Sequence, residues 1–354
     1  MKRRYWAIAG LGVLVLAACA EIGYYGQALR GQVDLLSRRQ DIQTLLEQPD
    51  IDGQLRGRLT LALEIRDFAS QSLALPENGS YRSYADLQRS AVVWNVFAAQ
   101  PYSVQLKTWC YPVIGCAAYR GYFHREDAQA LAEELRHAGL ETYVAPIPAY
   151  STLGWFDDPL PNTVIAWPEH RLAALIFHEL AHQVVYISDD TEFNESFART
   201  VEEEGLRRWV AANGRDELAC RYRRDRENAR YFSQQVLEVR ERLKVLYESG
   251  ADVTLMAEKK SLLLAELRER FRQRWGEDGP YKRWLAEVNN ARIGAVAAYE
   301  ALVPAFRGLL QGVGGDLPAF YREVERLGER PAADREKTLS KIGGHSSAPP
   351  LNPC

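Results

Sequence analysis

The sequence has few cysteines, little net charge and a single long apolar run. Five cysteines in 354 residues are too few for a fold built on disulfide bonds. The 44 basic and 47 acidic residues give a formal net charge of −3, which argues against nucleic-acid binding through a basic face. No internal repeat is visible. The hydrophobic content of 47% is that of a folded protein with one large or two ordinary domains, and it excludes a disordered chain.

The apolar run lies at the N-terminus. Three basic residues at positions 2–4 precede twelve apolar or small residues at positions 5–16. Such a run is too short to span a bilayer comfortably, but it suits the core of a signal peptide. It ends in Leu-Ala-Ala-Cys at Cys19, which resembles the bacterial lipobox, where cleavage falls before the cysteine and the cysteine carries lipid. In the alternative, the segment is an ordinary signal peptide and Cys19 is incidental.

The lipobox interpretation indicates a compartment. Alanine rather than aspartate follows Cys19, and by analogy with enterobacterial sorting this predicts the outer membrane, with the body of the protein in the periplasm. Cleavage leaves 336 residues with a formal charge of −6. Because this compartment is oxidising, we expect a disulfide between Cys110 and Cys116, which flank a five-residue segment containing Pro and Gly. The pattern leaves open whether Cys220 and Cys354 pair or stay free.

The residue pattern predicts an α+β protein that is mainly helical. Apolar residues such as Leu29, Val33 and Leu36 recur at helical spacing from residue 21 to about residue 70, with a break at 49–53. A short mixed segment follows a loop at 76–80. Its predicted strands cover residues 90–99, 117–123, 141–146 and 162–167, and its predicted helix covers residues 125–138. We therefore expect a small mixed sheet beside the helices.

Beyond residue 168 nearly all of the pattern is helical. Phe232, Val236 and Val239 begin an apolar series that resumes after a break at 249–252, which predicts a long antiparallel helical hairpin. The alternative is a coiled-coil surface for a partner. Residues 329–354 are rich in Pro, Gly and Ser and are predicted to be a flexible tail. The predicted parts are a signal peptide (1–18), an N-terminal helical segment (19–85), a small α/β part (86–168), a helical part with the hairpin and the motif described next (169–328), and the tail (329–354).

One motif in the helical part carries chemical meaning. His178 and His182 frame the sequence HELAH, an HExxH motif flanked by apolar residues at helical spacing. Residues four apart lie on one face of a helix, so both imidazoles can reach one metal ion. The alternative is a helix whose histidines pack against neighbours or face solvent. A catalytic zinc site also needs a third protein ligand and an open position for water.

The next helix offers the third ligand. We expect the motif helix to end at Ile187. A short turn at 188–190 follows, and Asp190 or Thr191 can cap a second helix that returns antiparallel beside the first. Counting along that helix places Glu195 next to His182. The acidic residues 202–204 are rivals for this role. We expect Glu195 to be the ligand, and Glu202 to lie behind the ligands, to anchor a substrate amine, or simply to face solvent.

These motifs together resemble the gluzincin metallopeptidases, which include many zinc aminopeptidases. In that family an Asn-Glu-x-Phe-Ala helix follows HExxH, and its glutamate, here Glu195, is the third ligand. More narrowly, the chain resembles the bacterial predicted-aminopeptidase lipoproteins in four features. They are the lipobox, WCYP at 109–112 with Cys116, YSTLGWFDDP at 150–159, and FHELAHQ at 177–183 followed by NESFA. Twelve residues separate His182 from Glu195, where the best-known gluzincin aminopeptidases have a longer insertion, so their substrate pocket is not carried over.

The resemblance implies a zinc-dependent aminopeptidase that hydrolyses N-terminal peptide bonds. The two histidines and Glu195 would hold zinc, and Glu179 would take a proton from the zinc-bound water and pass it to the leaving amine. Gluzincin aminopeptidases also stabilise the oxyanion with a tyrosine. Tyr299 is the candidate in this chain, and Tyr186 on the motif helix is a weaker one.

The segment at 150–159, or the predicted strand after it at 162–167, is a candidate wall of the substrate cleft. It precedes the motif helix, where related peptidases have a strand that binds substrate backbone. Gly154, Asp157 and Asp158 are therefore candidate substrate-binding residues, as is Glu202. In the alternative, the two aspartates form a turn that caps a strand.

Three functions fit the sequence. The first is a lipid-anchored aminopeptidase with peptide substrates and a zinc cofactor. The second is an endopeptidase that acts on envelope proteins. The third is a non-catalytic envelope adaptor, in which the metal braces the fold and the long helices bind a partner. No nucleic-acid partner is expected, and the sequence does not indicate an oligomeric state.

Overall fold

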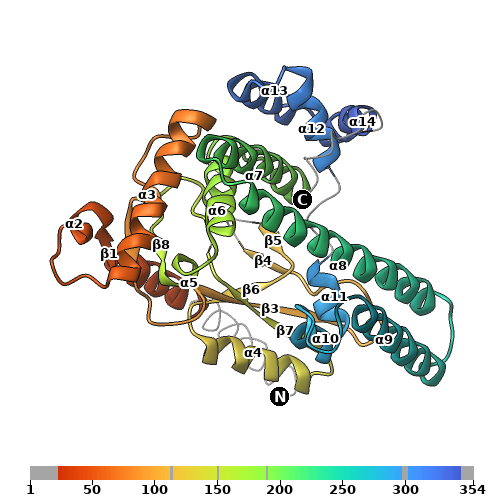
Figure 1. Cartoon of the computed structure of the whole chain (residues 1–354). Helices are drawn as coiled ribbons and strands as arrows, with labels where there is room; N and C mark the ends of the chain where they lie inside the picture. The colour runs from red at the N-terminus through yellow and green to blue at the C-terminus, as the bar shows by residue number, and fades with distance from the viewer. Residues whose placement is uncertain (1–22, 112–114, 150, 189, 297–301, 344–354) are drawn as a thin grey trace, which may run out of the picture.

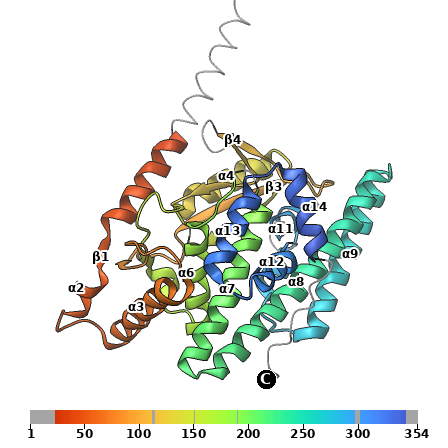
Figure 2. The same cartoon turned by 90° about the horizontal axis from the view of Figure 1, so that it is seen from above.

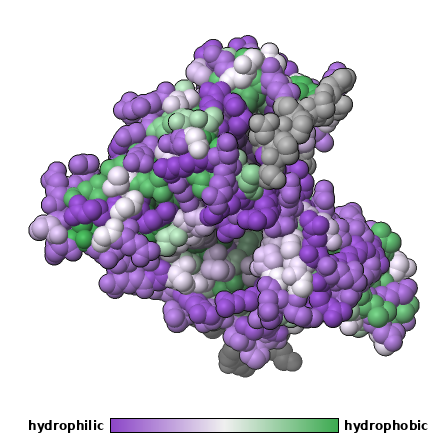
Figure 3. All heavy atoms as spheres, in the orientation of Figure 1, coloured by the Kyte–Doolittle hydropathy of each residue, from purple (hydrophilic) through white to green (hydrophobic). Residues whose placement is uncertain are grey.

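The computed structural model describes residues 23–111, 115–149, 151–188, 190–296 and 302–343. Over these residues the protein is mainly helical and contains three small sheets, so the α+β prediction is confirmed. Figure 1 shows one group of helices above a central sheet and a long helical hairpin that extends to the right. The face drawn in Figure 3 is hollowed between the upper helices and the sheet.

The N-terminal part combines helices with a small mixed sheet. A helix over residues 23–37 leads to β1 (Arg39–Asp41), α2 (Ile42–Leu46) and α3 (Gly53–Leu73). Strand β2 (Ser83–Ala85) pairs antiparallel with β1 and parallel with β8 (Leu160–Pro161). The Asp52 carboxylate accepts a hydrogen bond from the N–H of Leu55 and caps α3. The predicted break before α3 is therefore present, but β1 interrupts the helical run expected ahead of it.

The central sheet is antiparallel. It has the order β6 (Arg120–Tyr122), β3 (Val93–Ala99) and β7 (Glu141–Ile147). Helix α4 (Arg125–His137) covers it through Ala128, Ala132 and Leu135. Strands β4 (Trp109–Tyr111) and β5 (Gly115–Ala117) form a separate ribbon joined by a disulfide between Cys110 and Cys116. Cys220 is also disulfide-bonded, and Cys354 lies outside the described residues.

Side-chain amides bond both outer strands of the central sheet. Gln27, on the helix over residues 23–37, donates to the carbonyl of Gly121 at 3.3 Å and accepts from the N–H of Phe123 at 3.2 Å. These are the two backbone groups that a further antiparallel strand would use. At the other outer strand, Asn289 donates to the carbonyl of Thr142 at 3.0 Å. The N-terminal helix is therefore fixed to β6.

The remaining elements are helices. They are α5 (Asn162–Ile165), α6 (Glu169–His182), α7 (Thr191–Asn213), α8 (Asp216–Glu248), α9 (Val253–Trp275), α10 (Lys282–Ala286), α11 (Asn290–Val296), α12 (Val303–Gly312), α13 (Leu317–Gly328) and α14 (Ala332–Gly343). Helices α8 and α9 form the predicted hairpin, and Phe232, Leu243 and Leu267 belong to its apolar core. Figure 2 shows the hairpin from above, at one side of the molecule.

The main core lies where α3, α6 and α7 meet α12 and α13. Its largest fully buried side chains include Phe177, Phe197 and Phe320. Gly205 on α7 allows these helices to approach closely, because a Cβ atom there would lie 2.8 Å from Leu73 Cδ1 and 2.8 Å from Phe177 Cδ2. The motif helix α6 is thus packed on two sides and holds its histidines on a rigid support.

The predicted strand at 162–167 is wrong. Strand β8 ends at Pro161, and residues Asn162–Ile165 form α5 instead. The Asn162 side chain accepts a hydrogen bond from the N–H of Leu87, and Val164 and Ile165 are buried in the main core. A short apolar run fits a buried helical turn as well as a buried strand, so periodicity could not separate them.

The prediction of a flexible tail is wrong for residues 332–343. These residues form α14, whose Leu339 is buried in the main core. Arg335 donates to the carboxylate of Asp190 at 2.6 Å and to the carbonyl of Arg330 at 2.7 Å. The contact with Asp190 and the burial of Leu339 order a segment whose composition indicates disorder. Residues 344–354 lie outside the described part.

Candidate metal centre

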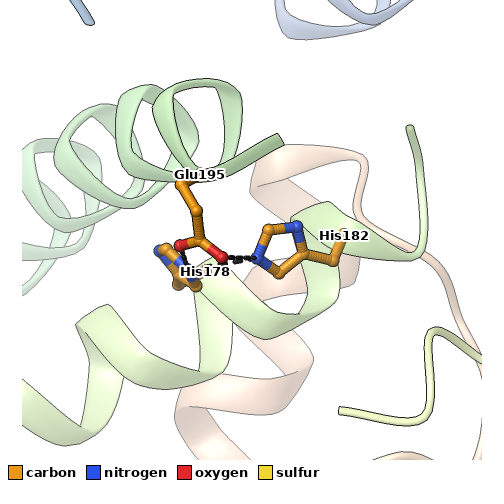
Figure 4. Close-up of side chains that lie close together, drawn as sticks. All are labelled: His178, His182 and Glu195. Carbon is orange, nitrogen blue, oxygen red and sulfur yellow. Dashed lines mark hydrogen bonds and ion pairs between the residues drawn. The ribbon is translucent and has the colours of Figure 1, made fainter. Parts of the chain in front are cut away.

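Two histidines lie side by side at the C-terminal end of α6. The Nε2 atoms of His178 and His182 are 3.2 Å apart, and the ring centroids are 4.8 Å apart. The opposite face of the helix, with Leu172, Ile176 and Leu180, is buried in the main core. Both imidazoles therefore point to one place beside the helix, as the four-residue spacing predicts (Figure 4).

Helix α6 ends at His182, five residues before the end expected at Ile187. The Asn194 side chain donates to the carbonyl of Ile187 at 2.7 Å and accepts from its N–H at 2.8 Å. The Asp190 carboxylate caps α7 by accepting from the N–H of Phe193 at 3.2 Å. Asn194 thus takes the place of the hydrogen bonds that the N–H and carbonyl of Ile187 would make in a longer helix. The chain can therefore turn early, and α7 can return beside α6.

This return brings Glu195 to the histidines. Its Oε2 atom lies 3.3 Å from His178 Nε2, and its Oε1 atom lies 3.7 Å from His182 Nε2. Figure 4 shows the carboxylate between the two imidazoles, and one donor atom from each residue lies within 4.8 Å of the others. Two imidazoles and one carboxylate are a donor set that suits zinc. The structure thus places together the three residues that the sequence assigned to a metal.

Hydrogen bonds and burial set the charges of this group. Burial acts to lower the pKa of His178, but hydrogen bonds to Glu195 and Glu202 outweigh it and raise that pKa to about 9. Burial and the neighbouring His178 lower the pKa of His182 to about 4. For Glu195, burial is outweighed by the hydrogen bond and charge of His178, and its pKa is lowered. The neighbouring carboxylates therefore favour a positive charge on His178, at a place that also suits a metal cation.

Glu179 is the half-buried neighbour of this group. Burial raises the pKa of its carboxyl group to about 7; Glu195, Asp158 and Glu202 act in the same direction and His178 acts against it. A carboxyl group with a pKa near neutrality can both accept and return a proton. It is not one of the three clustered donors, which fits a proton carrier rather than a ligand.

Glu202 lies behind His178. Its Oε2 atom is 3.1 Å from His178 Nδ1, and its Oε1 atom accepts a hydrogen bond from the phenol of Tyr222 at 2.9 Å. Arg199 also donates to both carboxylate oxygens. Burial opposes ionisation of Glu202, but Arg199 and His178 outweigh it and lower the pKa to about 2. A buried, ionised carboxylate on Nδ1 holds the imidazole so that Nε2 faces the cluster.

The other two rival acids pair with arginines. Glu203 accepts hydrogen bonds from Arg307, and Glu204 accepts from Arg207 and Arg208. Neither residue belongs to the clustered donors. Of the three acidic residues at 202–204, only Glu202 contacts a motif histidine among the described hydrogen bonds and ion pairs.

The loop over residues 151–158 lies beside the end of α6. Gly154 has φ +82°, and a Cβ atom there would lie 3.6 Å from the Gln183 side chain. Asp158 is buried and accepts from the N–H and hydroxyl of Thr152, each at 2.8 Å. Asp157 accepts from the N–H of Gly79 at 3.0 Å. The two aspartates therefore order this loop and its neighbour, which agrees with the turn alternative.

The structure places two tyrosines near the cluster. The ring of Tyr186 lies 6.3 Å from that of His182. Tyr119, just before β6, was not singled out from the sequence; burial raises the pKa of its phenol, and Tyr186, Tyr24 and Glu195 add to the shift through their proximity. The sequence predicts the strand that contains Tyr119, but no local motif indicates that this strand lies beside the motif helix. Tyr299 lies outside the described residues.

Comparison with known proteins gives one match. A family model described as "Putative aminopeptidase" matches residues 23–339. The chain belongs to this family. The match covers α6 and α7 of this aminopeptidase-family protein and therefore includes all three clustered residues. It supports a peptidase function in general. No curated protein and no solved structure matches the chain.

Proposed function

We propose that this chain is a zinc-dependent aminopeptidase that removes N-terminal residues from peptides in the bacterial envelope. The observation that carries the proposal is the group of His178, His182 and Glu195, with donor atoms within 4.8 Å, in a member of the aminopeptidase family. The HExxH spacing and the Asn-Glu-x-Phe-Ala helix support assignment to the gluzincin type.

The chain supplies the groups that such a reaction needs. When bound by the three donors, zinc would lower the pKa of water and polarise the scissile carbonyl. Glu179 accepts the proton of the attacking water and passes it to the leaving amine. Glu202 keeps Nε2 of His178 directed at the cluster through its bond to Nδ1. Tyr186, whose ring lies 6.3 Å from that of His182, and Tyr119, whose phenol interacts electrostatically with Glu195, are our candidates for a donor to the developing oxyanion.

We also propose that lipid on Cys19 tethers the protein to the outer membrane, on the periplasmic side. The basic residues at 2–4, the apolar run at 5–16 and the sequence Leu-Ala-Ala-Cys support this location. Among the described residues, no helix has both the length and the apolar character needed to cross a membrane.

Paired peptides test the activity. The purified protein is incubated with a peptide that has a free amino terminus and with its N-acetylated form, each with and without a metal chelator. An aminopeptidase hydrolyses only the free form, and chelator abolishes this. Equal cleavage of both peptides would indicate an endopeptidase, and no cleavage of a broad panel by the zinc-loaded protein would favour the adaptor.

A further inference from the structure

The helix over residues 23–37 carries an exposed apolar stripe. Tyr25, Leu29 and Val33 are 43%, 68% and 56% exposed. Residues spaced by four lie on one helical face, so the three side chains form a continuous row about 12 Å long. The sequence pattern placed Leu29 and Val33 in an amphipathic helix, yet the fold leaves both of them in solvent.

The opposite face of this helix is fixed. Gln27 holds two backbone groups at the outer side of β6, and the Arg120 guanidinium lies 4.0 Å from the ring centroid of Tyr24. Gly31 packs against Phe123 so closely that a Cβ atom would lie 2.0 Å from the ring. The helix therefore cannot rotate to bury its stripe without losing these contacts. Figure 2 shows it, in red, at the edge of the molecule.

The chain ahead of the stripe indicates what covers it. Tyr25 follows the expected lipid-bearing Cys19 by six residues. Six extended residues span at most about 22 Å, so the anchored helix stays close to the membrane surface. Arg30, exposed on the same helix, adds a positive charge that suits anionic headgroups. A row of three side chains is also narrow compared with the roughly 800 Å² per partner that a stable protein dimer buries.

We propose that Tyr25, Leu29 and Val33 insert into the interfacial region of the bilayer, so that the helix lies along the membrane and fixes the orientation of the metal centre above it. This inference rests on the lipid anchor of the proposed function. It does not depend on the peptidase activity, which a soluble peptide reports separately. The occupant of the stripe is a phospholipid surface.

The test compares two equally exposed leucines. Leu29→Cys and Leu262→Cys are made in the full-length acylated protein; each wild-type leucine is 68% exposed, and Leu262 lies on α9. Both variants are labelled with a nitroxide, using unmutated protein as the background control. They are reconstituted into vesicles of phosphatidylethanolamine and phosphatidylglycerol. Power saturation then measures collisions with oxygen, which enriches in lipid, and with a water-soluble nickel chelate.

We expect the label at position 29 to be protected from the nickel chelate severalfold in vesicles, while the label at position 262 collides with it as freely as in water. Equal nickel accessibility at both positions, with lipid on Cys19 verified by mass spectrometry, would overturn the membrane contact alone. Absence of lipid on Cys19 would overturn the anchor and this inference together. Concentration-dependent protection of position 29 in a Cys19→Ser variant without vesicles would instead assign the stripe to a second copy of the chain.

Discussion

Glu202 Oε2 lies 3.1 Å from His178 Nδ1, on the side of the imidazole away from the clustered donors. This carboxylate is itself held by Tyr222 and Arg199, so it can fix both the tautomer and the direction of the ring. The sequence leaves the position of Glu202 open, and this contact places it directly behind His178. It also makes a prediction about metal affinity.

The Glu202→Gln variant should bind zinc about 10- to 100-fold more weakly than the wild type, because a neutral amide orients His178 less firmly and reduces its basicity. Competition with a chromophoric chelator measures the affinity. Glu204→Gln is the matched control, since Glu204 pairs with Arg207 and Arg208 rather than with a motif histidine. An unchanged affinity for Glu202→Gln would show that the contact with His178 does not support the metal.

Replacing Glu195 should remove the metal more completely. We expect Glu195→Ala to lose stoichiometric zinc, because two imidazoles alone leave the ion without its anionic ligand. Glu192→Gln changes an exposed acid in the first turn of the same helix and should retain the metal. Elemental analysis of the purified variants gives the stoichiometry. Full zinc occupancy in Glu195→Ala would assign the third donor to another residue.

Glu179→Gln should separate binding from chemistry. The amide cannot carry a proton, so turnover of a free-amine peptide should fall by about 100-fold to 10,000-fold. Zinc content should stay near that of the wild type, because Glu179 is not one of the clustered donors. Steady-state kinetics and elemental analysis on the same preparation check both outcomes. Wild-type turnover in this variant would contradict the proposed role.

The close approach at Gly205 gives a prediction about stability. Gly205→Ala should lower the free energy of unfolding by about 1–3 kcal/mol, since its Cβ would overlap Leu73 and Phe177. Gly57→Ala, at an exposed position of α3 with no atom within 4 Å of its Cβ position, should instead be neutral or stabilise by up to about 1 kcal/mol. Urea unfolding monitored by circular dichroism compares the two variants. Equal effects would show that α7 relaxes away from α3 and α6.

Local patterns were sufficient for much of the site. The spacing of His178 and His182 fixes their common helical face, and the cap at Asp190 lets a sequence count place Glu195 beside them. The sequence predicts that the motif helix ends at Ile187, which is wrong. The two hydrogen bonds by which Asn194 satisfies the backbone of Ile187 form only once the turn exists, so no sequence pattern reveals the earlier helix end. The error did not move Glu195 away, since α7 still returns antiparallel to α6.

Features that depend on distant contacts could not be predicted. The sequence predicts the disulfide between Cys110 and Cys116 and a strand over residues 117–123, but no local pattern shows that this segment brings Tyr119 close to the motif helix. Helix α14 is ordered by Arg335 and Leu339, which contact parts of the chain more than a hundred residues away or the main core. In both cases packing between distant segments supplies the free energy that orders the segment. The composition of a segment describes only that segment and does not include this contribution.

The side-chain amides of Gln27 and Asn289 also affect how readily the protein aggregates. An outer strand with open N–H and C=O groups is a template on which another chain can add a strand and begin to aggregate. Gln27 bonds one such group on β6 and another directly after it, at Phe123, and Asn289 bonds one on β7. Gln27 lies on the N-terminal helix and Asn289 lies immediately before α11, and both are far from these strands in sequence. These backbone groups are therefore protected only once the helical parts have docked, and a chain that has not yet completed this step would be the aggregation-prone species.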